Sequence, residues 1–291
     1  MASSHRFTPG DDAVPPLRAR AATWLVSGRA LVDQVDLDVH AGELVALIGP
    51  NGAGKSTLCR LLAGDLEPST GSVDLFGRPG ADHPRRARAR LRAVLPQRSS
   101  PIAFPALDVV VMGRHPWLRP SAAPGPDDFE LATAAMEEVG VGDLADRPFD
   151  RLSGGEQARV QLARVLVQQT PVLLLDEPTA NLDLRHQHLV VAVARSRADA
   201  GVAVVAVLHD VALAAAYADR VVSLDQGRLV ACGPPAEVLT GALLSDLYRH
   251  PVTTVAHPSQ PWDVPVAERL DPGPAPARGG RHSIRSLDTR W

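Results

Sequence analysis

The apolar run Leu44 to Ile48 is followed at once by the segment Gly49-Pro-Asn-Gly-Ala-Gly-Lys-Ser56. The run has the length of one buried strand. The residues after the glycines continue as a helix with three leucines on one face, Leu58, Leu61 and Leu62. A strand, a glycine-rich loop and a helix in this order are the context that the pattern G-x-x-x-x-G-K-[ST] requires. The combination predicts an α/β fold and makes a plain glycine-rich turn a poor alternative.

The glycine segment has the chemistry of a phosphate-binding loop. Its glycines allow backbone N–H groups to turn inward around phosphate oxygens. Lys55 places a positive charge at the outer phosphates, and Ser56 offers a hydroxyl to Mg²⁺. The N-terminus of the following helix adds its dipole.

Further apolar runs alternate with helical patterns along the chain. Val172–Leu175 and Val202–Leu208 have the length of buried strands. Val221–Leu224 and Leu229–Ala231 flank Asp-Gln-Gly-Arg, which predicts a hairpin. This alternation indicates a mostly parallel sheet covered by helices on both faces.

Composition divides the chain into three parts. Residues 1–16 are predicted to form a flexible tail, 17–250 a folded domain and 251–291 a C-terminal extension. The last part of the extension, roughly 270–291, is rich in Pro, Gly and Arg and is expected to be a disordered tail. Within the domain, residues 98–152 contain many prolines and a helical pattern at Asp127–Val139. We interpret this stretch as a helical subdomain inserted into the sheet domain.

The bulk properties exclude several classes of function. The net charge of −3 comes from mixed signs, so no overall basic field attracts nucleic acid. The arginine-rich run 85–92 has no interleaved aromatic residues and is typical of a solvated helix face rather than a nucleic-acid site. Cys59 and Cys232 have no metal-binding or redox spacing. No signal peptide is visible, and no apolar run reaches the roughly 18 residues that cross a bilayer.

Two acidic residues follow the strand at Val172. Asp176 is expected at the carboxyl end of the sheet, where it would hold Mg²⁺ through water, and Glu177 would polarise an attacking water molecule. A solvated acidic turn is the alternative. The loop that contains Lys55 favours the magnesium-binding interpretation, because a phosphate-binding loop needs a partner that holds Mg²⁺.

Residues Ser153-Gly-Gly-Glu156 form a capping box, in which the serine bonds forward and the glutamate bonds back. Val160, Ala163 and Val167 give the helix that follows a buried face. A capped helix start of this kind is also suited to receive a phosphate.

Taken in order, these motifs resemble those of the ATP-binding cassette (ABC) family over residues 17 to about 240. The resemblance implies an α/β cassette with a parallel sheet, an inserted helical subdomain and a small antiparallel sheet near the N-terminus. It also implies ATP hydrolysis with Mg²⁺ by a head-to-tail homodimer. The nucleotide-binding residues that it implies are Gly49, Pro50, Asn51, Gly52, Ala53, Gly54, Lys55, Ser56, Thr57, Ser153, Gly154, Gly155 and Asp183.

The same resemblance assigns roles to single residues. Glu177 would be the general base, and His209 would contact the γ-phosphate, although a strand-end histidine without that role is the alternative. Gln97 would sense the γ-phosphate and, with Ser56 and Asp176, hold the metal. Asp183 would lie at the dimer interface, with Ser153 and Gly155 pressing on the triphosphate of the other copy.

Two positions depart from the family's pattern, and the histidines at 186 and 188 carry no motif. The expected adenine-stacking aromatic position falls near Val26, with Trp24 two residues earlier, and Trp24 either stacks or belongs to the core. Glu156 replaces the commoner glutamine, which we interpret as a tolerated variant. His186 and His188 are interpreted as surface residues.

Segment 109–117 resembles that of importer ATPases for iron chelates and cobalamin. Segment 256–265 resembles the end of importer ATPases for hemin and favours hemin as the cargo. The resemblance implies transmembrane permease subunits and a substrate-binding protein as partners, and a peripheral position on the cytoplasmic face of the membrane. A ferric siderophore or cobalamin remains the alternative cargo, and a non-transport ABC ATPase is the rival class. Direct heme ligation by His257 is not expected.

Overall fold

The computed structural model describes residues 14–97, 102–258 and 262–269. Its central sheet contains the strands β3 (Leu44–Ile48), β6 (Arg92–Leu95), β7 (Val172–Asp176), β8 (Ala203–Val207), β9 (Arg220–Asp225) and β10 (Arg228–Gly233). Their spatial order is β10-β9-β3-β8-β7-β6. All neighbours are parallel except β9 and β10, which form the predicted hairpin.

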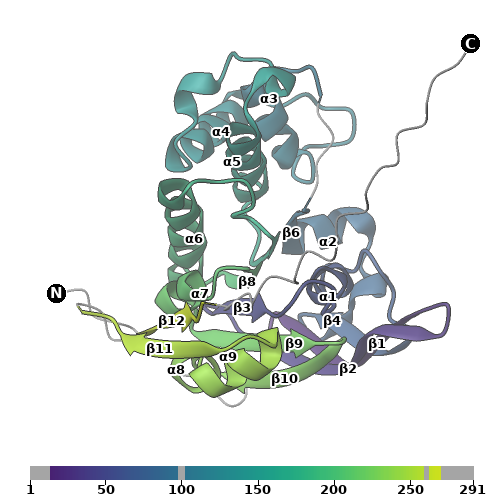
Figure 1. Ribbon diagram of the computed structural model, residues 1–291. Helices are drawn as coiled ribbons and strands as arrows, with labels where there is room; N and C mark the ends of the chain where they lie inside the picture. Colours follow the sequence, from purple (N-terminus) through teal and green to yellow (C-terminus); the bar gives the residue numbers. More distant parts are fainter. Residues whose placement is uncertain (1–13, 98–101, 259–261, 270–291) are drawn as a thin grey trace, which may run out of the picture.

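A second, antiparallel sheet lies near the N-terminus and has the order β2-β1-β4-β5 (Figure 1). Its strands are β1 (Leu17–Val26), β2 (Arg29–Val39), β4 (Thr70–Leu75) and β5 (Arg78–Pro79). Arg18 and Arg20 both pair with Asp38 across β1 and β2, at 3.0 Å and 2.7 Å. This sheet matches the small antiparallel unit that the ABC resemblance implies.

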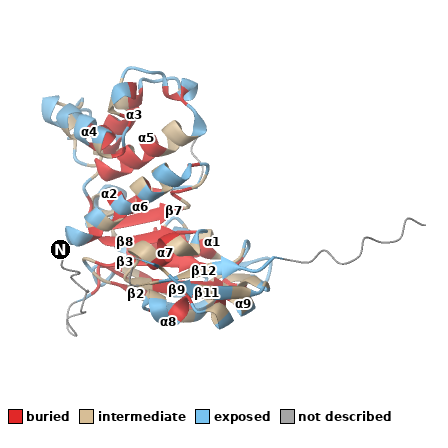
Figure 2. Ribbon diagram, turned by 60° about the vertical axis from the view of Figure 1, so that its left-hand side comes forward, coloured by how far each residue is buried: buried red, intermediate tan, exposed pale blue. Residues whose placement is uncertain are grey.

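The central sheet buries both faces, as its continuous apolar strands predict. Leu44, Ala46 and Ile48 of β3 face one hydrophobic core, while Val45 and Leu47 face another. The second core contains the helix α1 (Lys55–Leu62), which packs between the two sheets. Buried residues follow the sheet and the helix faces turned towards it (Figure 2). Alternation along the strands thus produces a three-layer arrangement that places the start of α1 at the carboxyl end of β3.

Among the described residues, seven further α-helices lie between β5 and residue 240: α2 (Arg85–Leu91), α3 (Ala106–Val111), α4 (Pro126–Glu138), α5 (Gly154–Leu166), α6 (Leu184–Asp199), α7 (Val211–Tyr217) and α8 (Pro235–Val238). The helices α3, α4 and α5 contact one another and stand apart from the sheet as a helical unit (Figure 1). They lie between β6 and β7 in the chain, as the inserted subdomain was expected to do. The boundaries at residues 98 and 152 stay predictions.

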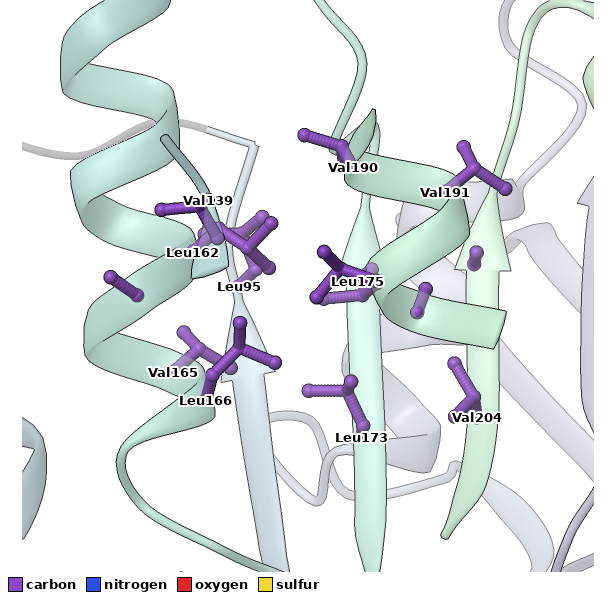
Figure 3. Packing of buried hydrophobic residues seen from close by; sticks show 14 of the residues in the cluster. Leu95, Val139, Leu162, Val165, Leu166, Leu173, Leu175, Val190, Val191 and Val204 are labelled. Atoms are coloured by element: carbon purple, nitrogen blue, oxygen red, sulfur yellow. The ribbon is translucent and has the colours of Figure 1, made fainter. Parts of the chain in front are cut away.

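The helical unit is joined to the sheet by apolar packing between α5, α6 and the strands. Leu162, Val165 and Leu166 of α5 share one hydrophobic core with Leu173 and Leu175 of β7. Val190 and Val191 of α6 belong to the same core, on the same face of the sheet (Figure 3). The interior is continuous from the helical unit into the sheet domain.

The proline-broken segment around residue 116 is fixed to its surroundings by several polar contacts. Arg86 and Arg90 of α2 both donate to the carbonyl oxygen of Pro116, at 3.0 Å and 2.7 Å. Trp117 donates from Nε1 to the carbonyl of Gln168 at 2.7 Å, beneath the guanidinium of Arg90. Arg86 and Arg90 therefore hold the segment around Pro116 in place, and this part of the arginine-rich run is not a freely solvated face.

The C-terminal extension begins with regular structure. Helix α9 (Gly241–Tyr248) leads into the hairpin of β11 (Val252–Ala256) and β12 (Asp263–Ala267), and Trp262 packs against the main core. Most of the predicted N-terminal tail, and the predicted tail 270–291, lie outside the described residues. None of the helices in the described ranges has the length and apolarity needed to cross a membrane.

Candidate nucleotide-binding site

The glycine segment wraps around the start of α1 as the sequence predicts. Lys55 is buried, and its Nζ donates to the carbonyl oxygens of Gly49 and Pro50 at 2.7 Å and 3.0 Å. Gly49 has φ of +144°, and a Cβ there would stand 2.2 Å from the carbonyl oxygen of Leu224 in β9. Only glycine fits this close approach between the loop and its neighbouring strand.

The cavity at the loop, of about 230 Å³, is smaller than a cavity of about 410 Å³ elsewhere in the chain. The smaller cavity is the one lined by predicted phosphate-binding residues. Its lining consists of Leu31, Asn51, Gly52, Ala53, Gly54, Lys55, Ser56, Thr57 and Glu177. Burial lowers the pKa of Lys55, while Glu177 and Asp176 act in the opposite direction. The cavity therefore combines a glycine-rich loop with one cation and a nearby carboxylate.

Asp176 ends β7 next to the start of α1. Its Oδ1 accepts a hydrogen bond from the hydroxyl of Ser56 at 2.9 Å. Burial raises the pKa of Asp176, against the hydrogen bond from Ser56. A buried carboxylate and a hydroxyl in contact are the oxygen donors that suit Mg²⁺.

Glu177 connects three segments that are far apart in the sequence. Its Oε2 accepts a hydrogen bond from the Gln97 amide at 2.8 Å, and its Oε1 lies 2.8 Å from Nε2 of His209. Partial burial acts to raise the pKa of Glu177, but the hydrogen bonds from His209 and Gln97 outweigh it and lower that pKa. The carboxylate is therefore kept ionised and is oriented by two donors at the edge of the cavity.

The other predicted nucleotide-binding residues form a second pocket, here called the Ser153 pocket. Its lining consists of Ser153, Gly154, Gly155, Glu156, Arg159, Asn181, Leu182, Asp183 and His186, and its volume is about 530 Å³. It shares no lining residue with the cavity at the phosphate loop. The sequence-predicted residues are thus brought together as two separate sets rather than one.

Helix starts supply the polar groups of the Ser153 pocket. Ser153 caps α5 in the predicted capping box with Glu156. Asp183 caps α6 and accepts the backbone N–H of His186 at 2.9 Å. Because α5 is an amphipathic helix of 13 residues, its N-terminus brings a positive dipole end into this pocket.

The roles of Trp24, Val26 and His209 were left open by the sequence. The half-buried Trp24 packs against the core that contains α1, and neither it nor Val26 lines the cavity at the phosphate loop. Base stacking by either residue stays a prediction. His209 is largely exposed and rests on Glu177, so its contact with a γ-phosphate also stays a prediction.

One titratable member of the Ser153 pocket, His186, was not predicted from the sequence. His186 was interpreted as a surface residue, but its ring lies 2.8 Å from the Asp183 carboxylate and lines the pocket. The i, i+3 spacing of Asp183 and His186 at a helix start was the available signal. Leu31 of β2 also lines the cavity at the phosphate loop, and no local pattern marked it.

Comparison with known proteins decides the family. The model of the ABC transporter family matches residues 32–180. This chain belongs to the ABC transporter family. As an ABC transporter ATPase, it is an ATP-hydrolysing enzyme, and the expected cassette fold is confirmed.

Two curated relatives of this ABC ATPase are similar over nearly their whole length. The hemin import ATP-binding protein of Rhodococcus jostii is 52% identical, over 85% of this chain and 87% of the relative. The protein of the same name from Streptomyces coelicolor is 55% identical, over 87% of this chain and 91% of the relative.

Solved structures agree with the fold. A metal-chelate type ABC transporter in an inward-facing conformation has a chain that matches with a TM-score of 0.75 and 26% identity, covering 87% of this chain and 98% of that one. The dimeric cassette MJ0796 bound to ADP and phosphate matches with a TM-score of 0.68 and 24% identity, over 75% and 98% of the two chains. The second likeness concerns the fold alone.

Proposed function

We propose that this ABC ATPase powers the import of hemin across the cytoplasmic membrane. The observation that carries the proposal is identity of 52–56% to four hemin import ATP-binding proteins, over 79–87% of this chain. The partners would be transmembrane permease subunits and a substrate-binding protein. The protein would then lie peripherally, on the cytoplasmic face of the membrane.

The site of hydrolysis would be composite. Two copies would pair head to tail, so that the phosphate loop of one copy and the Ser153 pocket of the other enclose the same triphosphate. The separation of the two pockets supports this arrangement, because each collects only part of the predicted binding set. ATP would favour the closed pair because it bonds both copies only in that state.

Within one copy, Lys55 would turn from the carbonyl oxygens of Gly49 and Pro50 to the outer phosphates of ATP. Ser56 and Asp176 fit a bound Mg²⁺, and the predicted third ligand is the side-chain oxygen of Gln97. Mg²⁺ would neutralise the negative charge that develops during transfer of the phosphoryl group.

Glu177 would act as the general base. It must be ionised to accept a proton from water, and the contacts with Gln97 and His209 favour that form. The same contacts orient its carboxylate beside the phosphate loop. Gln97 and His209 would therefore position the base in addition to contacting the nucleotide.

The transport function is tested by reconstituting the protein with its permease in lipid vesicles and adding the loaded substrate-binding protein. Stimulation of ATPase activity by hemin-loaded binding protein alone is expected. Stimulation by binding protein loaded with a ferric siderophore or with cobalamin would leave the mechanism unchanged and identify that compound as the transported substrate. Failure of any permease to associate with the protein would favour the non-transport class.

The role of Glu177 is tested separately with Glu177→Gln. This variant should bind ATP with unchanged affinity and lose at least ~100-fold in turnover, because the amide cannot accept the proton from water. It should also accumulate an ATP-dependent dimer, measured by light scattering during gel filtration. Turnover at the unmodified rate would remove Glu177 from the mechanism.

A further inference from the structure

The hydroxyl of Ser153 is bonded to its own chain. Its Oγ donates to Oε2 of Glu156 at 2.8 Å, and the backbone N–H of Ser153 reaches the same oxygen at 2.8 Å. The reverse bond, from the N–H of Glu156 to Oγ, is long at 3.4 Å. Because a serine hydroxyl has one proton to donate, a phosphate that approaches Ser153 competes with Glu156 for it.

Glu156 also brings a negative charge to this end of α5. The hydrogen bonds from the hydroxyl and the backbone of Ser153 lower the pKa of Glu156, so the side chain is ionised at neutral pH. It lines the same pocket as Asp183, a second carboxylate. A triphosphate entering the Ser153 pocket therefore meets two anionic side chains as well as the positive end of the α5 dipole.

Arg159 and His186, the basic side chains that line the pocket, have partners of their own. Arg159 is buried and donates to the carbonyl oxygens of Val139 and Gly140 at 3.3 Å and 2.6 Å. His186 lies against Asp183. Neither Arg159 nor His186 forms an ion pair with Glu156 among the described residues.

We propose that Glu156 sets the ATP concentration at which two copies pair, by holding the Ser153 hydroxyl and repelling the triphosphate bound to the other copy. This inference rests on the composite site of the proposed function. It assigns Glu156 a regulatory role and replaces the interpretation of this residue as a tolerated variant. Glutamine at this position would still accept the N–H of Ser153, so the cap of α5 would be kept while the charge is removed.

The test compares Glu177→Gln with the double variant Glu177→Gln/Glu156→Gln, because both hold ATP without turnover. The dimer fraction is measured against ATP concentration by sedimentation velocity. Removing the charge should lower the ATP concentration at half-maximal dimer by about fivefold. The difference should shrink as NaCl is raised from about 50 to about 500 mM, because salt screens the repulsion.

Asp128 supplies the matched control. It caps the start of α4 from the same position that Glu156 occupies in α5, and it does not line the Ser153 pocket. Asp128→Asn in the Glu177→Gln background should leave the ATP midpoint unchanged, even if the loss of the ion pair between Asp128 and Arg114 lowers the melting temperature. A melting curve for each variant separates the two effects.

The possible results differ for the two proposals. Equal ATP midpoints with and without Glu156, or a shift of the same size at every salt concentration, would overturn the role of Glu156 and leave the composite site in place. No ATP-dependent dimer in either protein would overturn the composite site, and the role of Glu156 with it.

Discussion

One glycine from each of the two glycine motifs, Gly54 and Gly154, can be compared for what makes glycine necessary there. In the phosphate loop, Gly54 has φ of +100°, and a Cβ there would stand 2.3 Å from the carbonyl oxygen of Leu31. In the Ser153 pocket, a Cβ on Gly154 would meet no atom within 4 Å. Gly54 is therefore explained by the packing of this chain, and Gly154 is not. We propose that the glycine at 154 serves a molecule that approaches from outside, namely the second copy and its nucleotide.

Lys55→Ala is expected to have the largest effect on the phosphate-loop side of this comparison. Lys55 is the only cation among the described residues that line that cavity, and its loss should weaken ATP binding by at least ~100-fold, measured by isothermal titration calorimetry. Lys55 is also the only lysine in the chain. A lysine-selective acylating reagent should therefore label one side chain, apart from the N-terminus, and ATP should protect it. Unchanged affinity in the variant would show that the phosphates bind elsewhere.

Ser153→Arg tests the other pocket. A long cationic side chain at the start of α5 should obstruct the approach of a second copy, so the ATP-dependent dimer of the Glu177→Gln background should be lost. ATP affinity of the single copy should change by less than about twofold, because Ser153 does not line the phosphate-loop cavity. Persistence of the dimer in gel filtration would place the interface away from Ser153.

The smallest and sharpest comparison is Gly54→Ala against Gly154→Ala. The first should lower the free energy of unfolding by about 2–4 kcal/mol, because of the backbone clash and the positive φ. The second should change it by less than about 0.5 kcal/mol, since nothing occupies the space. Urea denaturation measures both. If Gly154→Ala nevertheless reduces dimer formation, its glycine serves the partner; equal losses of stability would contradict the comparison.

Local elements were predictable because their signals are local. The strand before Gly49, the helix after it and the hairpin at Asp225–Arg228 follow from apolar periodicity and turn residues. The contacts of Glu177 with Gln97 and His209 follow from the spatial order β6-β7-β8, which places the ends of three strands at one edge. No periodicity encodes that order, and here it was expected only from resemblance.

Other features depend on packing between distant segments. The pairing of β11 with β12 is stabilised from outside by Trp262 on the main core, whereas its sequence was interpreted only as an extension. Leu31 reaches the phosphate loop because β2 lies against it, and the pocket position of His186 follows from the approach of α6 to α5. Such neighbours could not be inferred from residue spacing.

The fastening of segment 114–117 has a mechanical consequence. Arg114 and Trp117 bind the carbonyls of Val167 and Gln168, at the C-terminal end of α5, whereas Ser153 stands at the opposite end. With 13 residues, α5 is a rod about 20 Å long. A tilt of about 10° around its anchored end would displace Ser153 by roughly 3 Å, the length of one hydrogen bond. The helix would thus act as a lever arm, and a slight rocking at its base would make or break a contact at its tip.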